Sequence, residues 1–217
     1  LEADASKDIV VMERLGSPIA KSGLTIQSQI SQVTRALQES WQADTNGQEL
    51  VPGERKADWL ENHLRHTPGK IGMKFDPKMI HRALDLIANR RAAWLRQEFV
   101  LAHGDPHEYN TLAVSNEQAA GYRLVDPDGM VFEAAYDLGI LLRNWIDTYR
   151  QADPAEELLR RAIWLSEQTA VAKNAIISWG FVEIVSTGIH LAELGYVEEA
   201  KDYLQLGEAV ATRLTQM

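Results

Sequence analysis

The chain has 217 residues, of which 45% are hydrophobic and none is cysteine, and it carries a formal net charge of −9 at pH 7. This length and composition indicate a compact domain built around one core, and the absence of cysteine excludes disulfides, thiolate metal sites and cysteine nucleophiles. The acidic balance argues against a nucleic-acid partner, which would require a basic stripe, and suits a polycationic small molecule.

The first predicted element is a short strand near the N-terminus. Residues 9–12 are apolar and are followed by the polar pair Glu13-Arg14 and then by Leu15-Gly16. This pattern is typical of a strand that runs into a turn. From the pattern alone, the segment would be a surface strand and turn of a helical domain.

Most of the remaining chain shows helical periodicity. Helices are predicted over 25–43 with Thr25 as the cap, over 55–66 before the Pro68-Gly69 break, over 77–98 with Pro77 in the first turn, and over 134–149, 154–167, 171–194 and 197–216. We find neither a signal-peptide pattern nor an apolar run suited to a membrane span. We therefore expect no membrane contact and a cytoplasmic location.

Polar residues concentrate in one stretch between these helices. It reads His103-Gly104-Asp105-Pro106-His107-Glu108-Tyr109-Asn110 and is followed by Leu124-Val125-Asp126-Pro127-Asp128-Gly129. The apolar segments 111–114 and 122–125 predict a β-hairpin between the two polar runs. The hairpin would bring both runs to the same place.

The spacing of these residues indicates phosphoryl transfer. Asp105 and Asn110 have the D-x-x-x-x-N interval that separates the base from the metal-binding amide in the protein-kinase catalytic loop. Asp126 would add a carboxylate ligand for Mg²⁺, and Gly104 would allow a tight turn before the base. Each motif alone would more often be an ordinary turn, but their order and the intervening hairpin favour the functional interpretation.

At these residues the chain resembles the aminoglycoside phosphotransferase family, whose catalytic loop has the form H-G-D-x-x-x-x-N and whose metal-binding aspartate opens a D-P-x-G-like turn. Residues 133–144 read Glu-Ala-Ala-Tyr-Asp-Leu-Gly-Ile-Leu-Leu-Arg-Asn, similar to the branch that contains streptomycin 6-kinases and aminoglycoside/hydroxyurea resistance kinases. The resemblance implies an α+β, mainly helical fold, namely a protein-kinase-like large lobe with a remnant of the small lobe and the hinge. It also implies ATP and Mg²⁺ as cofactors and a role in antibiotic resistance.

The resemblance assigns roles to individual residues. Asp105 would be the catalytic base, and Asn110 and Asp126 would be the Mg²⁺ ligands. His103 and Asp137 would be structural, with Asp137 at a helix start and tied back to the catalytic loop. Asp137 would equally serve as a first-turn acid that satisfies free N–H groups and the helix dipole, and the two roles are compatible.

The resemblance also interprets the N-terminal segment. Residues 1–16 would be the end of the small-lobe sheet and the hinge, and residues 17–217 would be the helical large lobe. Met12 would be the gatekeeper, and the main chain of Glu13 and Leu15 would receive the adenine. The glycine-rich loop and the phosphate-binding lysine of the family are not found, so we expect an incomplete portion that begins inside the small lobe.

Two further residues are candidate substrate contacts. His107 lies in the catalytic loop, where it would either approach phosphate and substrate or cap its own loop. Acidic residues of the C-terminal helices commonly line the aminoglycoside pocket in the family. Glu183 is the candidate for that role, although its local sequence is that of any helix acid.

Other conspicuous side chains receive structural interpretations. His63 and His66 lack an acidic partner at metal-ligand spacing and are expected to face solvent. His190 is expected in a helix near the core, and Trp145 is expected to anchor helix packing.

Together these features predict an ATP-dependent phosphotransferase that acts on a hydroxyl of a small, cationic, aminoglycoside-like molecule. Two alternatives stay open. One is a catalytically impaired, kinase-like nucleotide-binding or regulatory protein. The other is a helical interaction domain whose Asp and Asn residues only form turns, and it would bind no nucleotide with Mg²⁺.

Overall fold

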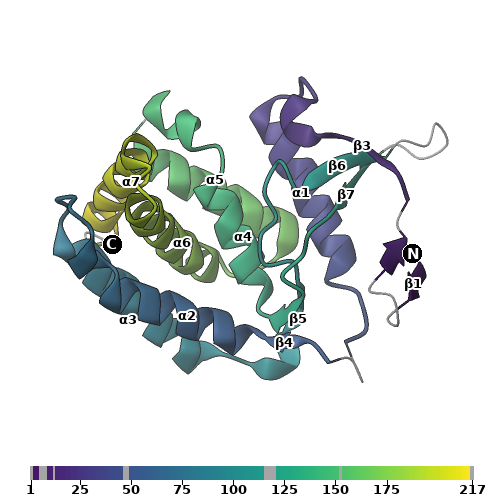
Figure 1. Ribbon diagram of the computed structural model, residues 1–217, viewed down its shortest axis with the longest axis horizontal. Coiled ribbons are helices and arrows are strands. Elements are labelled where there is room, and N and C mark those ends of the chain that lie inside the picture. The colour runs from purple at the N-terminus through teal and green to yellow at the C-terminus, as the bar shows by residue number, and fades with distance from the viewer. Residues whose placement is uncertain are drawn as a thin grey trace.

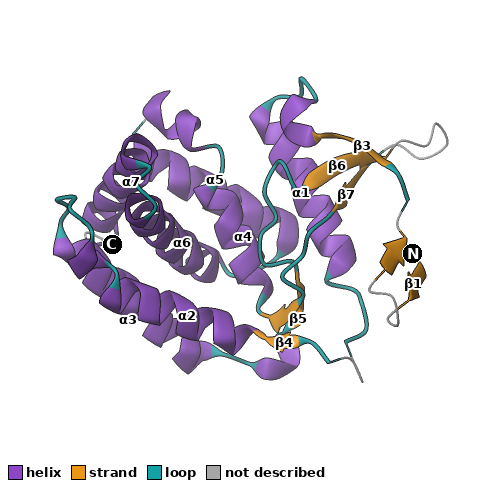
Figure 2. Ribbon diagram, viewed as in Figure 1, coloured by secondary structure: helices purple, strands orange, loops and turns teal. Residues whose placement is uncertain are grey.

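The computed structural model describes residues 2–4, 9–11, 13–45, 49–114, 121–151 and 153–215. The helices are α1 (Ile26–Ser40), α2 (Gly53–His66), α3 (Pro77–Ala93), α4 (Ala134–Arg143), α5 (Pro154–Thr169), α6 (Lys173–Glu193) and α7 (Val197–Thr215). The strands are β1 (Glu2–Asp4), β2 (Ile9–Val11), β3 (Leu15–Pro18), β4 (Val51–Pro52), β5 (Val100–Ala102), β6 (Thr111–Val114), β7 (Tyr122–Leu124) and β8 (Met130–Phe132). Short 3-10 helices cover Ile19–Lys21, Pro68–Lys70, Arg96–Glu98 and Ile146–Gln151. Figure 1 shows a body of helices with the strands gathered along one side, and Figure 2 shows the same arrangement by element type.

Helix α6 forms the centre of the core. It packs against α2, α3, α4, α5 and α7. Helix α4 approaches it so closely that a Cβ on Gly139 would lie 2.6 Å from the Cβ of Trp179. Among the described helices, α6 has the length and apolar composition of a membrane span, but 78% of its most apolar window is buried inside the structure. That burial is typical of a core helix.

The helix starts follow local capping chemistry. Thr25, Asp76 and Asp153 each accept a hydrogen bond from a backbone N–H group in the first turn of the helix that follows. Pro77 and Pro154 occupy the first helical positions, where proline loses no hydrogen bond. The predicted starts of α1, α3 and α5 are therefore confirmed.

Two predicted helices end earlier than their periodicity suggested. The helix expected over 77–98 ends at Ala93, because Trp94 is extended and its indole N–H donates to Glu133 Oε1 at 2.7 Å. The helix expected over 134–149 ends at Arg143, and Trp145 takes a left-handed φ of 55°. In both places contacts with distant residues override local helix propensity.

The strands bring the two polar runs together. Strands β6 and β7 form the predicted antiparallel hairpin, in which Thr111 faces Leu124, and β3 adds to its other edge. Strands β5 and β8 are also antiparallel neighbours. Since one polar run joins β5 to β6 and the other joins β7 to β8, both cross between the same two sheets. Strand β3 spans the boundary that we expected after residue 16.

Candidate functional site

The loop 103–110 is anchored to the helical body by Asp137, in the first turn of α4. The two carboxylate oxygens of Asp137 accept hydrogen bonds from the backbone N–H groups of His103 at 3.0 Å and Gly104 at 2.9 Å, and the Trp41 indole adds a third at 2.9 Å. Asp137 is fully buried. Burial raises its pKa, while the donors from Gly104, Trp41 and His103 act in the opposite direction. The carboxylate therefore fixes the loop to α4 and α1.

His103 ties the loop to the turn after β7. Its Nδ1 accepts the N–H of Asp105 at 3.3 Å, and its Nε2 lies 3.0 Å from the carbonyl oxygen of Val125. This pattern assigns the hydrogen to Nε2, which donates to that carbonyl. The carbonyl of His103 in turn accepts the N–H of Asp128 at 2.8 Å. The side chain and the backbone carbonyl of His103 therefore both hold the two polar runs side by side.

Gly104 is required by this close approach. Its φ is +90°, and a Cβ there would lie 2.6 Å from the Cβ of Asp128 and 2.7 Å from the Cε of Met130. Only glycine adopts such a backbone conformation without strain. The tight turn expected before Asp105 is therefore present.

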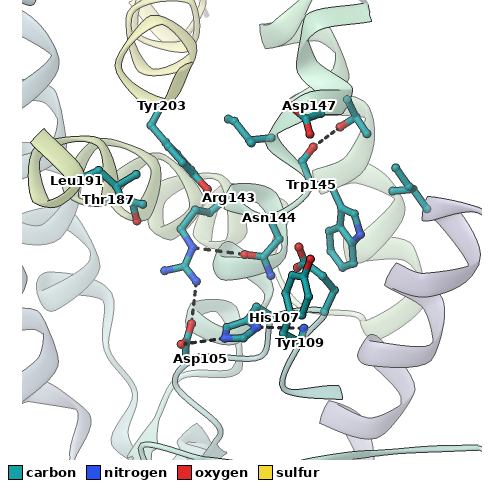
Figure 3. Close-up of a pocket in the computed structure, with 14 residues that line it drawn as sticks. Asp105, His107, Tyr109, Arg143, Asn144, Trp145, Asp147, Thr187, Leu191 and Tyr203 are labelled. Atoms are coloured by element: carbon teal, nitrogen blue, oxygen red, sulfur yellow. Dashed lines mark hydrogen bonds and ion pairs between the residues drawn. The ribbon is translucent and has the colours of Figure 1, made fainter. Parts of the chain in front are cut away.

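Asp105 is held from two sides. Its Oδ1 accepts a hydrogen bond from Arg143 Nη2 at 2.7 Å, and its Oδ2 lies 3.6 Å from His107 Nε2. Figure 3 shows Arg143 reaching this carboxylate from above, while His107 lies beside it. The Nδ1 of His107 accepts the N–H groups of Tyr109 and Asn110 at 3.1 and 3.2 Å. His107 thus caps its own loop and also lines the pocket beside Asp105.

Arg143 belongs to a buried chain of side chains that the sequence did not suggest. Its Nη1 donates to Glu183 Oε2 at 3.0 Å, and the Tyr136 hydroxyl donates to Glu183 Oε1 at 2.6 Å. Burial opposes the charge on Arg143, but Glu183 and Asp105 outweigh it and raise its pKa. Burial and the charge of Glu183 together raise the pKa of Tyr136 well above its ordinary value.

The structure places Glu183, the predicted substrate contact, away from the pocket beside Asp105. Glu183 is only 3% exposed, both of its carboxylate oxygens are occupied, and it does not line the pocket beside Asp105. It is linked to Asp105 through Arg143, which donates hydrogen bonds to both carboxylates. The only sequence signal for Arg143 was its place near the end of the 133–144 stretch, where nothing indicated a partner.

Asn110 and Asp126 lie on adjacent backbone. The N–H of Val125 donates to the carbonyl of Asn110 at 2.9 Å, which places Asp126 one residue beyond this bond. The side-chain amide nitrogen of Asn110 donates to the Asp105 carbonyl at 3.3 Å, so its amide oxygen remains available as a metal donor. Asp126 is exposed and has a left-handed φ of 58°, which aspartate tolerates better than most residues.

The hinge residues are only partly described. Met12 lies outside the described residues. Glu13 is exposed, and its Oε1 lies 3.8 Å from Nε of Arg123 on β7. Leu15 pairs with Val114 on β6. The segment that contains Glu13 and Leu15 therefore borders the hairpin.

An open pocket of about 520 Å³ adjoins Asp105 (Figure 3). Its wall combines carboxylates with aromatic rings, from Asp105, Glu108, Tyr109, Trp145, Asp147 and Tyr203. The guanidinium of Arg143 also lines the pocket but is paired with Asp105 and Glu183. The other carboxylates and the ring faces therefore suit a cation, because carboxylates attract positive charge and ring faces bind it.

The pocket segment after α4, which runs into the 3-10 helix Ile146–Gln151, is held in place by polar contacts. Trp145 packs against the core as expected, but it does so from beyond the end of α4, where its indole N–H donates to Gln29 on α1 at 3.0 Å. Arg161, which is 2% exposed, donates to the carbonyl of Asn144 at 3.1 Å and to the hydroxyl of Thr148 at 2.8 Å. These bonds fix the left-handed turn at Trp145 that closes the pocket wall.

Known structures share this architecture. The spectinomycin phosphotransferase APH(9)-Ia in complex with AMP superposes with a TM-score of 0.53 at 14% identity, over 90% of this chain and 69% of that one. An ethanolamine kinase from Plasmodium vivax superposes with a TM-score of 0.55 at 11% identity, over 93% of this chain and 62% of that one. These likenesses confirm the kinase-like α+β fold.

Sequence comparison places the chain within a family. A search of curated proteins found no significant match. A sequence model described as aminoglycoside/hydroxyurea antibiotic resistance kinase matches residues 1–195, so that the chain belongs to the aminoglycoside/hydroxyurea antibiotic resistance kinase family.

Proposed function

We propose that this chain carries the large lobe of an ATP-dependent phosphotransferase, with residues 1–16 as the end of the small lobe and the hinge. The acceptor would be a hydroxyl of a small cationic molecule such as a streptomycin-like aminoglycoside. The observation that carries the proposal is the position of Asp105, which lines an acidic pocket and shares its loop with Asn110, next to Asp126.

The chemistry follows from this placement. An acceptor hydroxyl in the pocket would donate a hydrogen bond to the carboxylate of Asp105, whose Oδ1 is oriented by Arg143. As the hydroxyl oxygen bonds to the γ-phosphorus, its proton passes to Asp105, and the bond from phosphorus to the leaving ADP oxygen breaks. Asp105 contributes mainly by orientation, because such transfer depends on positioning more than on covalent catalysis.

The donor set around the loop fits Mg²⁺. The amide oxygen of Asn110 and the carboxylate of Asp126 would hold it, since both are hard oxygen donors and the ion retains water and phosphate oxygens. When bound, Mg²⁺ neutralises charge on the phosphate oxygens. We place the adenine against the main chain of Glu13 and Leu15, with Met12 as the gatekeeper.

Substrate charge is the second element of the proposal. Glu108 and Asp147 add carboxylates to the pocket beside Asp105, and Trp145 and Tyr203 add aromatic rings. Ammonium or guanidinium groups of an aminoglycoside would find complementary charge there. Modification of such a molecule would give antibiotic resistance in the cytoplasm, where ATP is available.

The test is Mg²⁺-dependent transfer of the ATP γ-phosphate to a panel of aminoglycosides and small alcohols by the full-length protein. Asp105→Asn should retain nucleotide binding and lose transfer. Asp128→Asn is a matched control, because this neighbouring acid pairs with Lys56 and has no proposed role in transfer. Nucleotide binding without transfer to any acceptor would support a regulatory protein instead, and an Asp105→Asn variant that still transfers would refute the proposal.

A further inference from the structure

Two histidines and a glutamate from different helices converge away from the loop 103–110. His63 lies on α2, and His190 and Glu193 lie one turn apart on α6. One potential ligand atom from each of the three side chains lies within 4.8 Å of the other two. The rings of His63 and His190 meet edge to face with centroids 5.8 Å apart. This cluster joins two helices that pack against each other.

His63 is the unusual member of the cluster. It was expected to face solvent, but it is only 9% exposed, and its ring stacks on Trp59 with centroids 5.1 Å apart. The ring nitrogen Nδ1 lies 3.1 Å from the Thr67 hydroxyl, whereas Nε2 is buried and has no hydrogen-bond partner among the described residues. Buried polar atoms are nearly always paired, so an unpaired imidazole nitrogen calls for a ligand.

The surroundings of His63 favour a cation over a proton. Burial lowers the pKa of His63, which keeps the ring neutral and its nitrogen lone pair free. The charge of Glu193 and the backbone of Ser186 act to raise the pKa of the ring and the nearby His190 acts to lower it, but burial has the largest effect. A metal ion would satisfy the nitrogen and the carboxylate of Glu193 together.

We propose that His63 Nε2, the imidazole of His190 and a carboxylate oxygen of Glu193 bind one Zn²⁺ or similar first-row divalent ion that links α2 to α6. Two imidazoles and one carboxylate are a common zinc donor set, with water as the fourth ligand. Tetrahedral Zn²⁺ needs donor atoms about 3.3 Å apart. The side chains of His190 and Glu193 are 46% and 41% exposed, and His190 Nδ1 already lies 3.9 Å from Glu193 Oε2.

This site is distinct from the proposed Mg²⁺ site in both chemistry and place. Imidazole nitrogen selects transition metals, whereas Mg²⁺ requires hard oxygen ligands. None of His63, His190 and Glu193 lines the pocket beside Asp105, although Thr187 and Leu191 of the same helix do. Metal binding would stabilise the core helix without occupying the pocket.

The test is titration of the chelator-treated full-length protein with Zn²⁺, followed by calorimetry and thermal unfolding, with Co²⁺ absorption to report tetrahedral coordination. We expect one equivalent to bind and to raise the melting temperature. His190→Ala and Glu193→Gln change exposed side chains, so they should fold and should weaken binding at least about tenfold. His66→Ala, on the same helix as His63, and Asp126→Asn should bind as the unmodified protein does.

Each opposite result would overturn the proposal. Absence of one-equivalent binding would mean that Nε2 of His63 is left unpaired or is met by water. Equal affinity in His190→Ala and Glu193→Gln would place the ion elsewhere, and loss of binding in Asp126→Asn would place it beside the catalytic loop. None of these readouts uses phosphotransfer, so the result is independent of the proposed function.

Discussion

The buried carboxylate of Glu183 gives the sharpest test of how the site is supported. Glu183→Gln keeps the side-chain shape and the bond from the Tyr136 hydroxyl, but it removes the charge that faces Arg143 Nη1 at 3.0 Å. Breaking a buried ion pair from one side costs about 3–5 kcal/mol. The side chain of Arg143 keeps its ion pair with Asp105 at 2.7 Å and is 18% exposed. We therefore expect a loss of unfolding free energy at the lower end of this range, about 3 kcal/mol.

The variant should also impair the proposed reaction. Arg143 would no longer be held on both sides, so Asp105 would lose its orientation, and a misplacement of about 1 Å can cost ~100-fold in rate. We therefore expect kcat to fall by roughly 10- to 100-fold, while KM for the acceptor stays unchanged because Glu183 does not line the pocket.

Urea unfolding and steady-state phosphotransfer measure the two effects. Glu193→Gln, measured without metal, is the matched control, because it makes the same substitution at an exposed position of the same helix. It should change stability by no more than about 0.5 kcal/mol. A Glu183→Gln variant that matches this control in both stability and kcat would refute the idea that Glu183 acts through Arg143.

Three further predictions concern the loop and a peripheral ion pair. Gly104→Ala places a Cβ against Asp128 on a backbone with left-handed φ, so it should lower the free energy of unfolding by more than about 2 kcal/mol and abolish transfer. Urea unfolding measures the first effect, and a stability equal to wild type would contradict it. Asparagine tolerates the φ of 58° at position 126, so Asp126→Asn should change the free energy of unfolding by no more than about 0.5 kcal/mol. The Mg²⁺ concentration needed for transfer should rise, and an unchanged Mg²⁺ requirement would remove Asp126 from the proposed site. Hydrogen bonding to Arg160 lowers the pKa of Glu157 below its ordinary value of 4.5. The ionised Glu157 therefore stabilises the fold fully above pH 4.5, and this contribution is lost as the pH falls through the lowered pKa. In Glu157→Gln the free energy of unfolding should therefore fall less steeply as the pH is lowered below 4.5. An equally steep fall would show that other groups cause the loss of stability in acid.

Local chemistry explains which features the sequence could predict. The spacing of Asp105 and Asn110, the hairpin and the capping residues Thr25 and Asp153 are all properties of neighbouring residues. Side-chain period and turn chemistry determine such features almost independently of the rest of the fold. The position of the loop 103–110 therefore follows from the amino-acid sequence alone.

The errors have a common physical origin in contacts between distant segments. Trp94 and Trp145 leave their helices because each indole N–H finds a partner elsewhere in the chain. Glu183 turns inward to Arg143, and His63 turns inward to α6. No local pattern distinguishes these side chains from exposed ones, because only packing brings their partners close.

The pairing of Arg143 with Glu183 separates a role in stability from a role in orientation. Replacing a buried ion pair by neutral side chains of similar size is often harmless to stability, whereas removing one partner is costly. The double variant Arg143→Met with Glu183→Gln leaves no unpaired buried charge, and the new side-chain amide would still accept the hydrogen bond from the Tyr136 hydroxyl. We expect the free energy of unfolding to return to within about 1 kcal/mol of wild type, while transfer stays impaired because Asp105 lacks its guanidinium. Full recovery of transfer would mean that the pair only fills space. Additive losses of stability would mean that each charge supports the core independently of the other.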